Sequence, residues 1–178
     1  MTTQSAAASP SDAGAYRVSH EVQAYEHGHS PPLGGYAAIL AAFAGSVAAA
    51  VVSGRLSGRR PPKRYAIADV VLGGIATHKF ARIVTKDVVV SPVRVPFTRF
   101  DKPTGSGEVS ESPRDGSDLR QAVGQLLSCP FCLAPWIATG YVAALALAPR
   151  AARSWAAAMS TVAISDVLQH LYARVRTD

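Results

Sequence analysis

The feature that most constrains this sequence is a run of 22 residues without a charge, Leu33–Gly54. At 1.5 Å per residue, a helix of this length covers the hydrocarbon thickness of a bilayer, which is about 30 Å. Two further runs are nearly as apolar: Gln121–Pro149 has no charge, and Ser154–Ala173 has only Asp166. The sequence therefore predicts an all-α fold, a small helical bundle integral to a membrane.

The composition agrees with this prediction. Only 17% of the residues are charged, against about 25% in an ordinary soluble domain, and the mean hydropathy is +0.14. The chain still carries 18 Lys and Arg against 12 Asp and Glu, a formal net charge of +6. Beside membrane spans, we attribute this positive charge to anionic lipid headgroups. We expect no nucleic-acid partner.

The chain divides into a tail, residues 1–32, and a helical membrane domain, residues 33–178. Small and polar residues dominate the tail, and Pro31-Pro32 closes it, so we expect it to be flexible. Its start lacks the basic and apolar regions of a cleaved signal peptide, so we expect the apolar segments to stay in the mature chain. The tail holds a polar cluster whose spacing matches no defined metal site: His20, Glu21, Glu26, His27 and His29.

The segment 65–84 allows two interpretations, a span or an interfacial helix. Lys79, Arg82 and Lys86 share one helical face, which is typical of a helix leaving the bilayer through the headgroups. We therefore predict that these cations face lipid or a partner. The cluster Arg55–Arg64 is cytoplasmic by the positive-inside rule. Counting Lys and Arg favours three crossings in total, whereas pairing of charges inside a bundle would permit four.

Proline and glycine then predict an irregular connection. Residues 101–118 read as a polar, mobile loop. Ser117 is a suitable N-cap for a helix that begins the segment 121–149, and Pro130 and Pro135 should kink or interrupt that segment. Arg150 and Arg153 mark a tight turn before the final span, 154–173.

Cys129-Pro130-Phe131-Cys132 is the sharpest local motif, and three interpretations remain open. The pair could cycle between dithiol and disulfide, with a thiolate stabilised at a helix N-terminus. It could bind a metal ion if His78, His170 or a second subunit completed the ligands. It could also be a buried kink with inert thiols.

Two acids lie within apolar segments, Asp69 and Asp166. Intramembrane acids are functional candidates, and two that face each other could relay a proton. Alternatively, Asp166 could pair with His170, four residues further along the same helix.

Two segments carry a resemblance to a family. ATHKFARIVTKDVVVSPVRVPF (Ala76–Phe97) and LLSCPFCLAPWIA (Leu126–Ala138) resemble the basic-helix and Cys-x-x-Cys segments of the bacterial membrane family known as domain of unknown function 1360. The likeness extends over about 65–172 and implies a small multi-pass protein of the bacterial cell membrane. The family supplies no activity or cofactor to carry over. The residues that carry the resemblance are Thr77, Arg82, Asp87, Pro92, Arg94, Cys129, Cys132 and Trp136.

Phosphate-loop and catalytic-triad signatures are absent from the sequence, so we do not expect an enzyme. The leading hypothesis is a non-enzymatic membrane component that binds a partner protein or a second copy of itself. Arg94 is a further lipid- or partner-facing candidate. The alternatives are a membrane thiol-disulfide oxidoreductase and a metal-binding protein, both of which would use Cys129 and Cys132.

Overall fold

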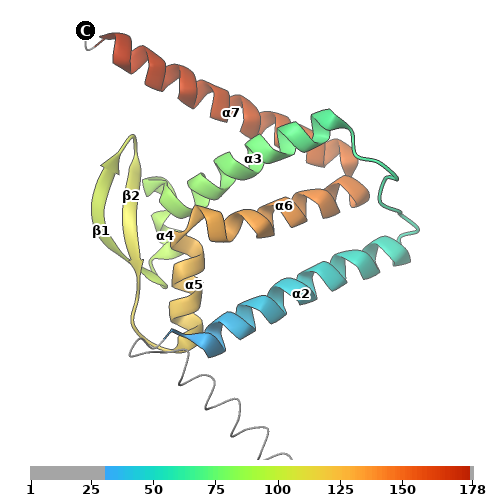
Figure 1. The fold of residues 1–178 in the computed structure, drawn as a ribbon, viewed down its shortest axis with the longest axis horizontal. Helices are drawn as coiled ribbons and strands as arrows, with labels where there is room; N and C mark the ends of the chain where they lie inside the picture. Colours follow the sequence, from blue (N-terminus) through green and yellow to red (C-terminus); the bar gives the residue numbers. More distant parts are fainter. Residues whose placement is uncertain (1–30, 177–178) are drawn as a thin grey trace, which may run out of the picture. The chain divides into compact units, whose positions relative to one another are not determined.

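The computed structural model describes residues 31–176 of the chain. Nearly all of the predicted tail, with its histidine cluster, lies outside these residues. The elements, in order, are α2 (Leu33–Leu56), α3 (Ile67–Lys86), η1 (Val88–Val90), α4 (Ser91–Arg94), β1 (Thr98–Gly105), β2 (Glu108–Pro113), α5 (Asp118–Ser128), α6 (Pro130–Leu147) and α7 (Pro149–Arg176). Figure 1 shows α2, α3 and α6 running between the same two ends, with α5 across one of those ends.

The fold is mostly helical, as predicted, but it is not all-α. Strands β1 and β2 form an antiparallel hairpin in which Thr98 pairs with Pro113 and Gly105 with Glu108. This hairpin replaces most of the loop expected over 101–118. Its turn uses three consecutive residues with positive φ, Gly105, Ser106 and Gly107, and glycine adopts that conformation without steric cost.

The predicted helices are confirmed, with two corrections at their ends. The segment 121–149 is divided at Cys129, where α5 ends and Pro130 opens α6. Pro135 lies inside α6 without ending it. The turn before α7 is at Ala148, so Arg150 and Arg153 lie within α7 rather than in the turn. Ser117 is confirmed as the N-cap of α5, because its side chain accepts the N–H of Arg120.

Among the described residues, α2 and α6 are long and apolar enough to cross a membrane, by length and composition alone. The most apolar stretch of α2 is not buried inside the protein at all. Helices α3 and α7 do not meet the same test. Charges recur along α3, and the sparsely charged part of α7 is less apolar because it includes residues such as Gln169 and His170. The sequence predicts three to four membrane-embedded helices. Length and composition support two of them, α2 and α6.

Small and aromatic residues pack α3, α6 and α7 together. The buried cluster comprises Ala76, Tyr141, Leu145, Ala152 and Ala156. A side chain at Gly73 would place its Cβ 2.2 Å from the ring of Tyr141, so α3 can approach α6 this closely only with glycine there. The Tyr141 hydroxyl donates to the carbonyl oxygen of Asp69 at 3.1 Å. Small residues at these contacts let the helices approach closely.

Helix α2 packs on α5 and α6 by similar means. Gly35 lies against Asp118 and Ala122 of α5. Further along, Phe43 meets Trp136 edge-on, with ring centroids 5.0 Å apart. These contacts fix one face of α2 and leave the rest of the helix exposed.

Candidate functional site

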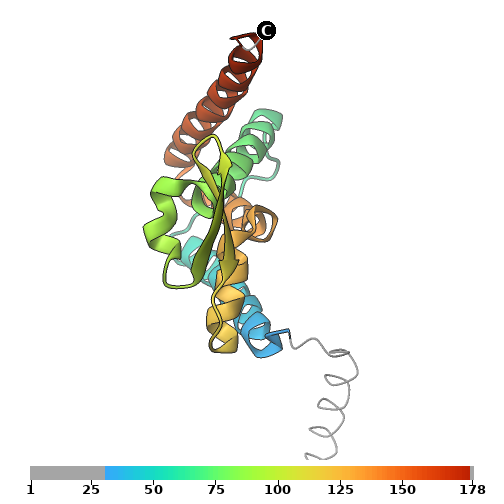
Figure 2. The same cartoon turned by 90° about the vertical axis from the view of Figure 1, so that its left-hand side faces the viewer.

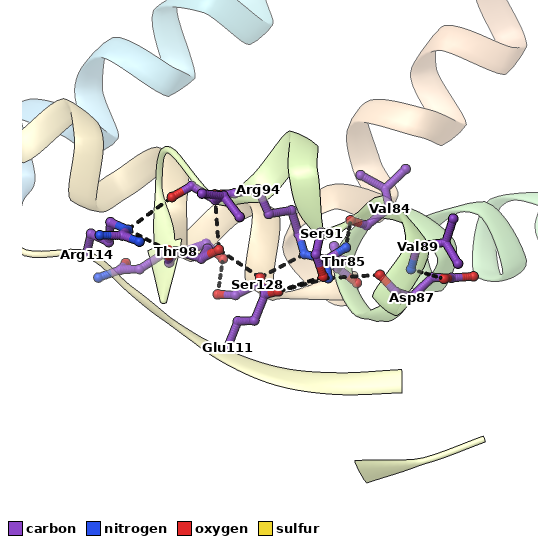
Figure 3. Close-up of polar contacts among 12 residues, drawn as sticks. Val84, Thr85, Asp87, Val89, Ser91, Arg94, Thr98, Glu111, Arg114 and Ser128 are labelled. Carbon is purple, nitrogen blue, oxygen red and sulfur yellow. Dashed lines mark hydrogen bonds and ion pairs between the residues drawn. The ribbon is translucent and has the colours of Figure 1, made fainter. Parts of the chain in front are cut away.

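A polar junction ties the end of α3 to the hairpin. We call residues 87–128, from η1 to α5, the headpiece. Arg94 and Glu111 form its centre, with side chains 0% and 4% exposed. Arg94 donates from Nε and Nη2 to the two carboxylate oxygens of Glu111, at 2.8 and 3.0 Å. The same guanidinium donates to the carbonyl oxygens of Val84 and Asp87, and Thr98 Oγ1 donates to Glu111 at 2.7 Å (Figure 3).

This network holds Glu111 in its charged form. Burial alone would raise the pKa of Glu111, but hydrogen bonds from Arg94, Thr98 and Ser91, together with the charge of Arg94, outweigh it. The pKa of Glu111 is therefore lowered from its ordinary value of 4.5. The junction is a permanent ion pair at neutral pH.

Arg94 corrects one sequence-based expectation. We expected it to face lipid or a partner, yet it is fully buried. The reason is that four acceptor groups surround its guanidinium, from α3, from Asp87 just before η1, from α4 and from β2. An arginine can be buried when its donors are matched in this way.

Three of the other residues that carried the family resemblance lie near the same junction: Asp87, Pro92 and Arg82. Asp87 caps η1 by accepting the N–H of Val89 at 2.8 Å, and Pro92 lies in the first turn of α4. Arg82 donates from two nitrogens to the carboxylate of Glu108. Thr77 is buried in α3. Trp136 lies apart from these residues, in α6, where its ring packs against Phe43 of α2.

A groove of about 1010 Å³ opens between α3, α7 and the hairpin turn. The ion pair Lys79–Asp166 joins α3 to α7 inside it, and the pair Arg82–Glu108 joins α3 to the hairpin. The remaining lining is mixed, with apolar side chains from both helices next to polar ones. Prominent among these residues are Ile75, His78, Asp87, Ile164, Val167 and His170. Lys79 and Arg82, predicted to face lipid or a partner, thus lie in the groove.

The two cysteines lie outside this groove. Both thiols are free, and Cys132 is exposed. Sγ of Cys129 accepts the N–H of Cys132 at 3.2 Å, so Cys129 serves as the N-cap of α6. Within residues 31–176, no three His, Cys, Asp or Glu side chains are grouped to hold a metal ion. His78 and His170, the suggested additional ligands, line the groove instead.

The structure does not bring Asp69 and Asp166 together, as a proton relay between them would require. Asp69 accepts two hydrogen bonds from Arg153, both at 2.8 Å. Asp166 pairs with Lys79, not with its predicted neighbour His170. Each acid is therefore tied to a cation from another helix.

Sequence reasoning missed the acids of the hairpin. Glu108 and Glu111 fell within the segment interpreted as a loop. The usable signal was the Gly-Ser-Gly sequence before an alternating EVSESP, which is typical of a hairpin. It was weak, because one of the inward positions of β2 is occupied by Glu111 instead of an apolar residue.

Comparison with known proteins gives one family and one distant relative. A family model described as "Protein of unknown function (DUF1360)" matches residues 72–172. The sporulation protein YjcA of Bacillus subtilis (strain 168) is 23% identical over 107 residues, which cover 59% of this chain and 91% of that protein. No solved structure matches. The matched residues include the headpiece, the groove and both cysteines.

Proposed function

Because the chain belongs to the DUF1360 family, whose function is unknown, we propose a function from its own residues. It is a non-enzymatic, multi-pass protein of the bacterial cell membrane. It carries the headpiece at one membrane surface and binds a partner protein in the groove.

The proposal that four helices cross rests on how α3 packs. Gly73 lies directly against Tyr141 of α6, and α3 runs antiparallel to α6 (Figure 1). From this packing we infer that α3 crosses the membrane if α6 does. Helix α7 packs on both α3 and α6, so we propose that it crosses with them.

The charges of α3 support the same topology. Asp69, Lys79 and Arg82 are each paired with an opposite charge from another element. Pairing lowers the cost of placing charged side chains within a bilayer. The count of Lys and Arg favours three crossings, but that count takes no account of cations neutralised inside the bundle.

The observation that carries the binding role is the charge balance of the groove. Lys79 and Arg82 are both matched by carboxylates from the facing walls. Matched charges beside apolar side chains suit recognition of a partner. A partner segment with apolar side chains fits between the exposed faces of α3 and α7.

Site-specific photo-crosslinking in native membranes tests this role. We would place a photoreactive amino acid at Val167 in the groove and, as a matched control, at Val142, which is exposed on α6 outside the groove. We expect a discrete protein adduct from Val167 and none from Val142. An adduct of two copies of this chain would identify a homo-oligomer. Equal results at the two positions would contradict binding in the groove.

A thiol-disulfide oxidoreductase is the second candidate. Its support is that Sγ of Cys129 accepts the N–H of Cys132 at 3.2 Å at the start of α6, a position that stabilises a thiolate. Forming the disulfide would release two protons and two electrons, which a membrane quinone would have to accept. Maleimide labelling of whole cells with and without reductant distinguishes the candidates. Labelling that requires reductant favours the oxidoreductase, and labelling that does not favours inert thiols.

A further inference from the structure

In the short turn between α3 and the hairpin, apolar side chains are exposed and the charged side chain is buried. We call residues 88–97 the valine turn; it comprises η1, α4 and the three residues that follow. Four of its side chains, Val88, Val89, Val93 and Val95, are between 48% and 81% exposed. Its one charged residue, Arg94, is fully buried. A turn folded in water would favour the opposite arrangement, so some apolar medium must cover these valines.

The position of the turn relative to α3 and α6 indicates that this apolar medium is lipid. Gly73 of α3 meets Tyr141 of α6. Eleven residues further along α3 is Val84, and eleven residues back along the antiparallel α6 is Pro130, about 16 Å in each case. The end of α3 therefore lies level with the start of α6, a candidate span. The valine turn begins four residues later, at the border between hydrocarbon and headgroups.

The backbone of the turn also suits this border, where unpaired N–H groups are costly. Val88 donates its N–H to Gly107, Val90 donates to Asp87, and Val95 donates to Ser91. Phe97 likewise donates to Arg94. Pro92 and Pro96 have no N–H to satisfy.

Cations stand at both ends of the valine turn. Lys86 precedes it by two residues, and Arg99 follows it by two on the exposed face of β1, where it also forms a 3.6 Å ion pair with Asp115. Side chains of this kind reach lipid phosphates from the edge of an apolar surface. In Figure 2, where the hairpin faces the viewer, α4 lies beside the hairpin and not behind it.

We propose that the valine turn inserts into the lipid bilayer at its headgroup border and anchors the headpiece there. The occupant of this surface is lipid. The inference rests on α6 crossing the membrane, and it goes beyond partner binding, because it assigns a separate surface to a separate medium.

Depth measurement with a fluorophore tests the proposal on the full chain. Cys129→Ser and Cys132→Ser remove the native thiols, and serine keeps the capping role at position 129. Single cysteines at Val89, Ser106 and Val142 would carry an environment-sensitive NBD label. The protein would be placed in vesicles of phosphatidylethanolamine and phosphatidylglycerol. Ser106, at the tip of the hairpin, is the water-exposed reference, and Val142 is the reference within the span.

We expect the label at Val89 to emit at a shorter wavelength than at Ser106 and to lose emission when lipids spin-labelled near the headgroup are added. If the label at Val89 emits like that at Ser106 while the label at Val142 reports lipid, the insertion of the valine turn is refuted and the span is not. A shifted but unquenched label at Val89 would also overturn it, because protein would then cover the surface. Emission at Val142 like that at Ser106 would instead refute the span, and with it the proposed function.

Discussion

The headpiece and the helices α3, α6 and α7 differ in the contacts at their centres. At the centre of the headpiece, Arg94 and Glu111 are buried and bonded to each other and to backbone carbonyls. At the centre of the helices, alanine, glycine and aromatic rings are in contact. The centre of the headpiece depends on charge and hydrogen-bond geometry. The centre of the helices depends on shape, in addition to the ion pairs Asp69–Arg153 and Lys79–Asp166 between α3 and α7.

This difference follows from what each region must satisfy. A regular helix satisfies its own backbone, so packing helices need only close approach. The headpiece contains short and irregular elements, and the Arg94 guanidinium bonds to two carbonyl oxygens at its border with α3, those of Val84 and Asp87. A substitution should therefore affect one region and leave the other intact.

The largest effect is expected from Glu111→Ala. It leaves Arg94 buried without its counter-charge, and breaking a buried pair costs about 3–5 kcal/mol. Hydrogen exchange in detergent should show the hairpin losing protection while α6 keeps its own. Glu108→Ala is the matched control on the same strand, because its partner Arg82 is 42% exposed and such pairs contribute about 0.2–1 kcal/mol. Equal losses in the two variants would refute the distinction.

The second effect concerns shape in the helices. Gly73→Ala forces the ring of Tyr141 to move, since the new Cβ would lie 2.2 Å from it, and overpacking of this kind costs about 1–3 kcal/mol. Gly74→Ala is the neighbouring control, because nothing lies within 4 Å of its Cβ. It should stabilise the helix by roughly 0.5–1 kcal/mol. Thermal unfolding in detergent measures both, and a Gly73→Ala variant as stable as the parent would contradict this packing.

The smallest effect is a pH dependence confined to the headpiece. The pKa of Glu111 is lowered in the folded protein, so its contribution to stability is fully present above the ordinary glutamate pKa. It is lost as pH falls through the folded value. Hairpin protection should therefore be constant near neutrality and decline only below about pH 4.5. Glu111→Gln should flatten that decline, and an unchanged decline in this variant would assign it to another group.

Local features of the chain were predicted better than contacts between residues far apart in the sequence. The apolar run 33–54 predicted α2 to within two residues at its end, because helix period and bilayer thickness are local constraints. Ser117 was likewise found from its own neighbourhood.

The polar contacts could not be found in this way. Arg94 and Glu111 are 17 residues apart, and Asp69 and Arg153 are 84 apart. Nothing in either local pattern indicates its partner. The groove, which α3, α7 and the hairpin turn form together, was not predictable for the same reason.

The most direct test of the account is the side of the membrane on which each end of α3 lies. Single cysteines at Ser57, before α3, and at Ser106, in the hairpin turn, would be introduced into the chain without its native cysteines. Both would be labelled in intact cells with a membrane-impermeant maleimide. If α3 crosses, one position is labelled in intact cells and the other only after permeabilisation. If both behave alike, α3 does not cross, and the four-helix membrane arrangement is contradicted.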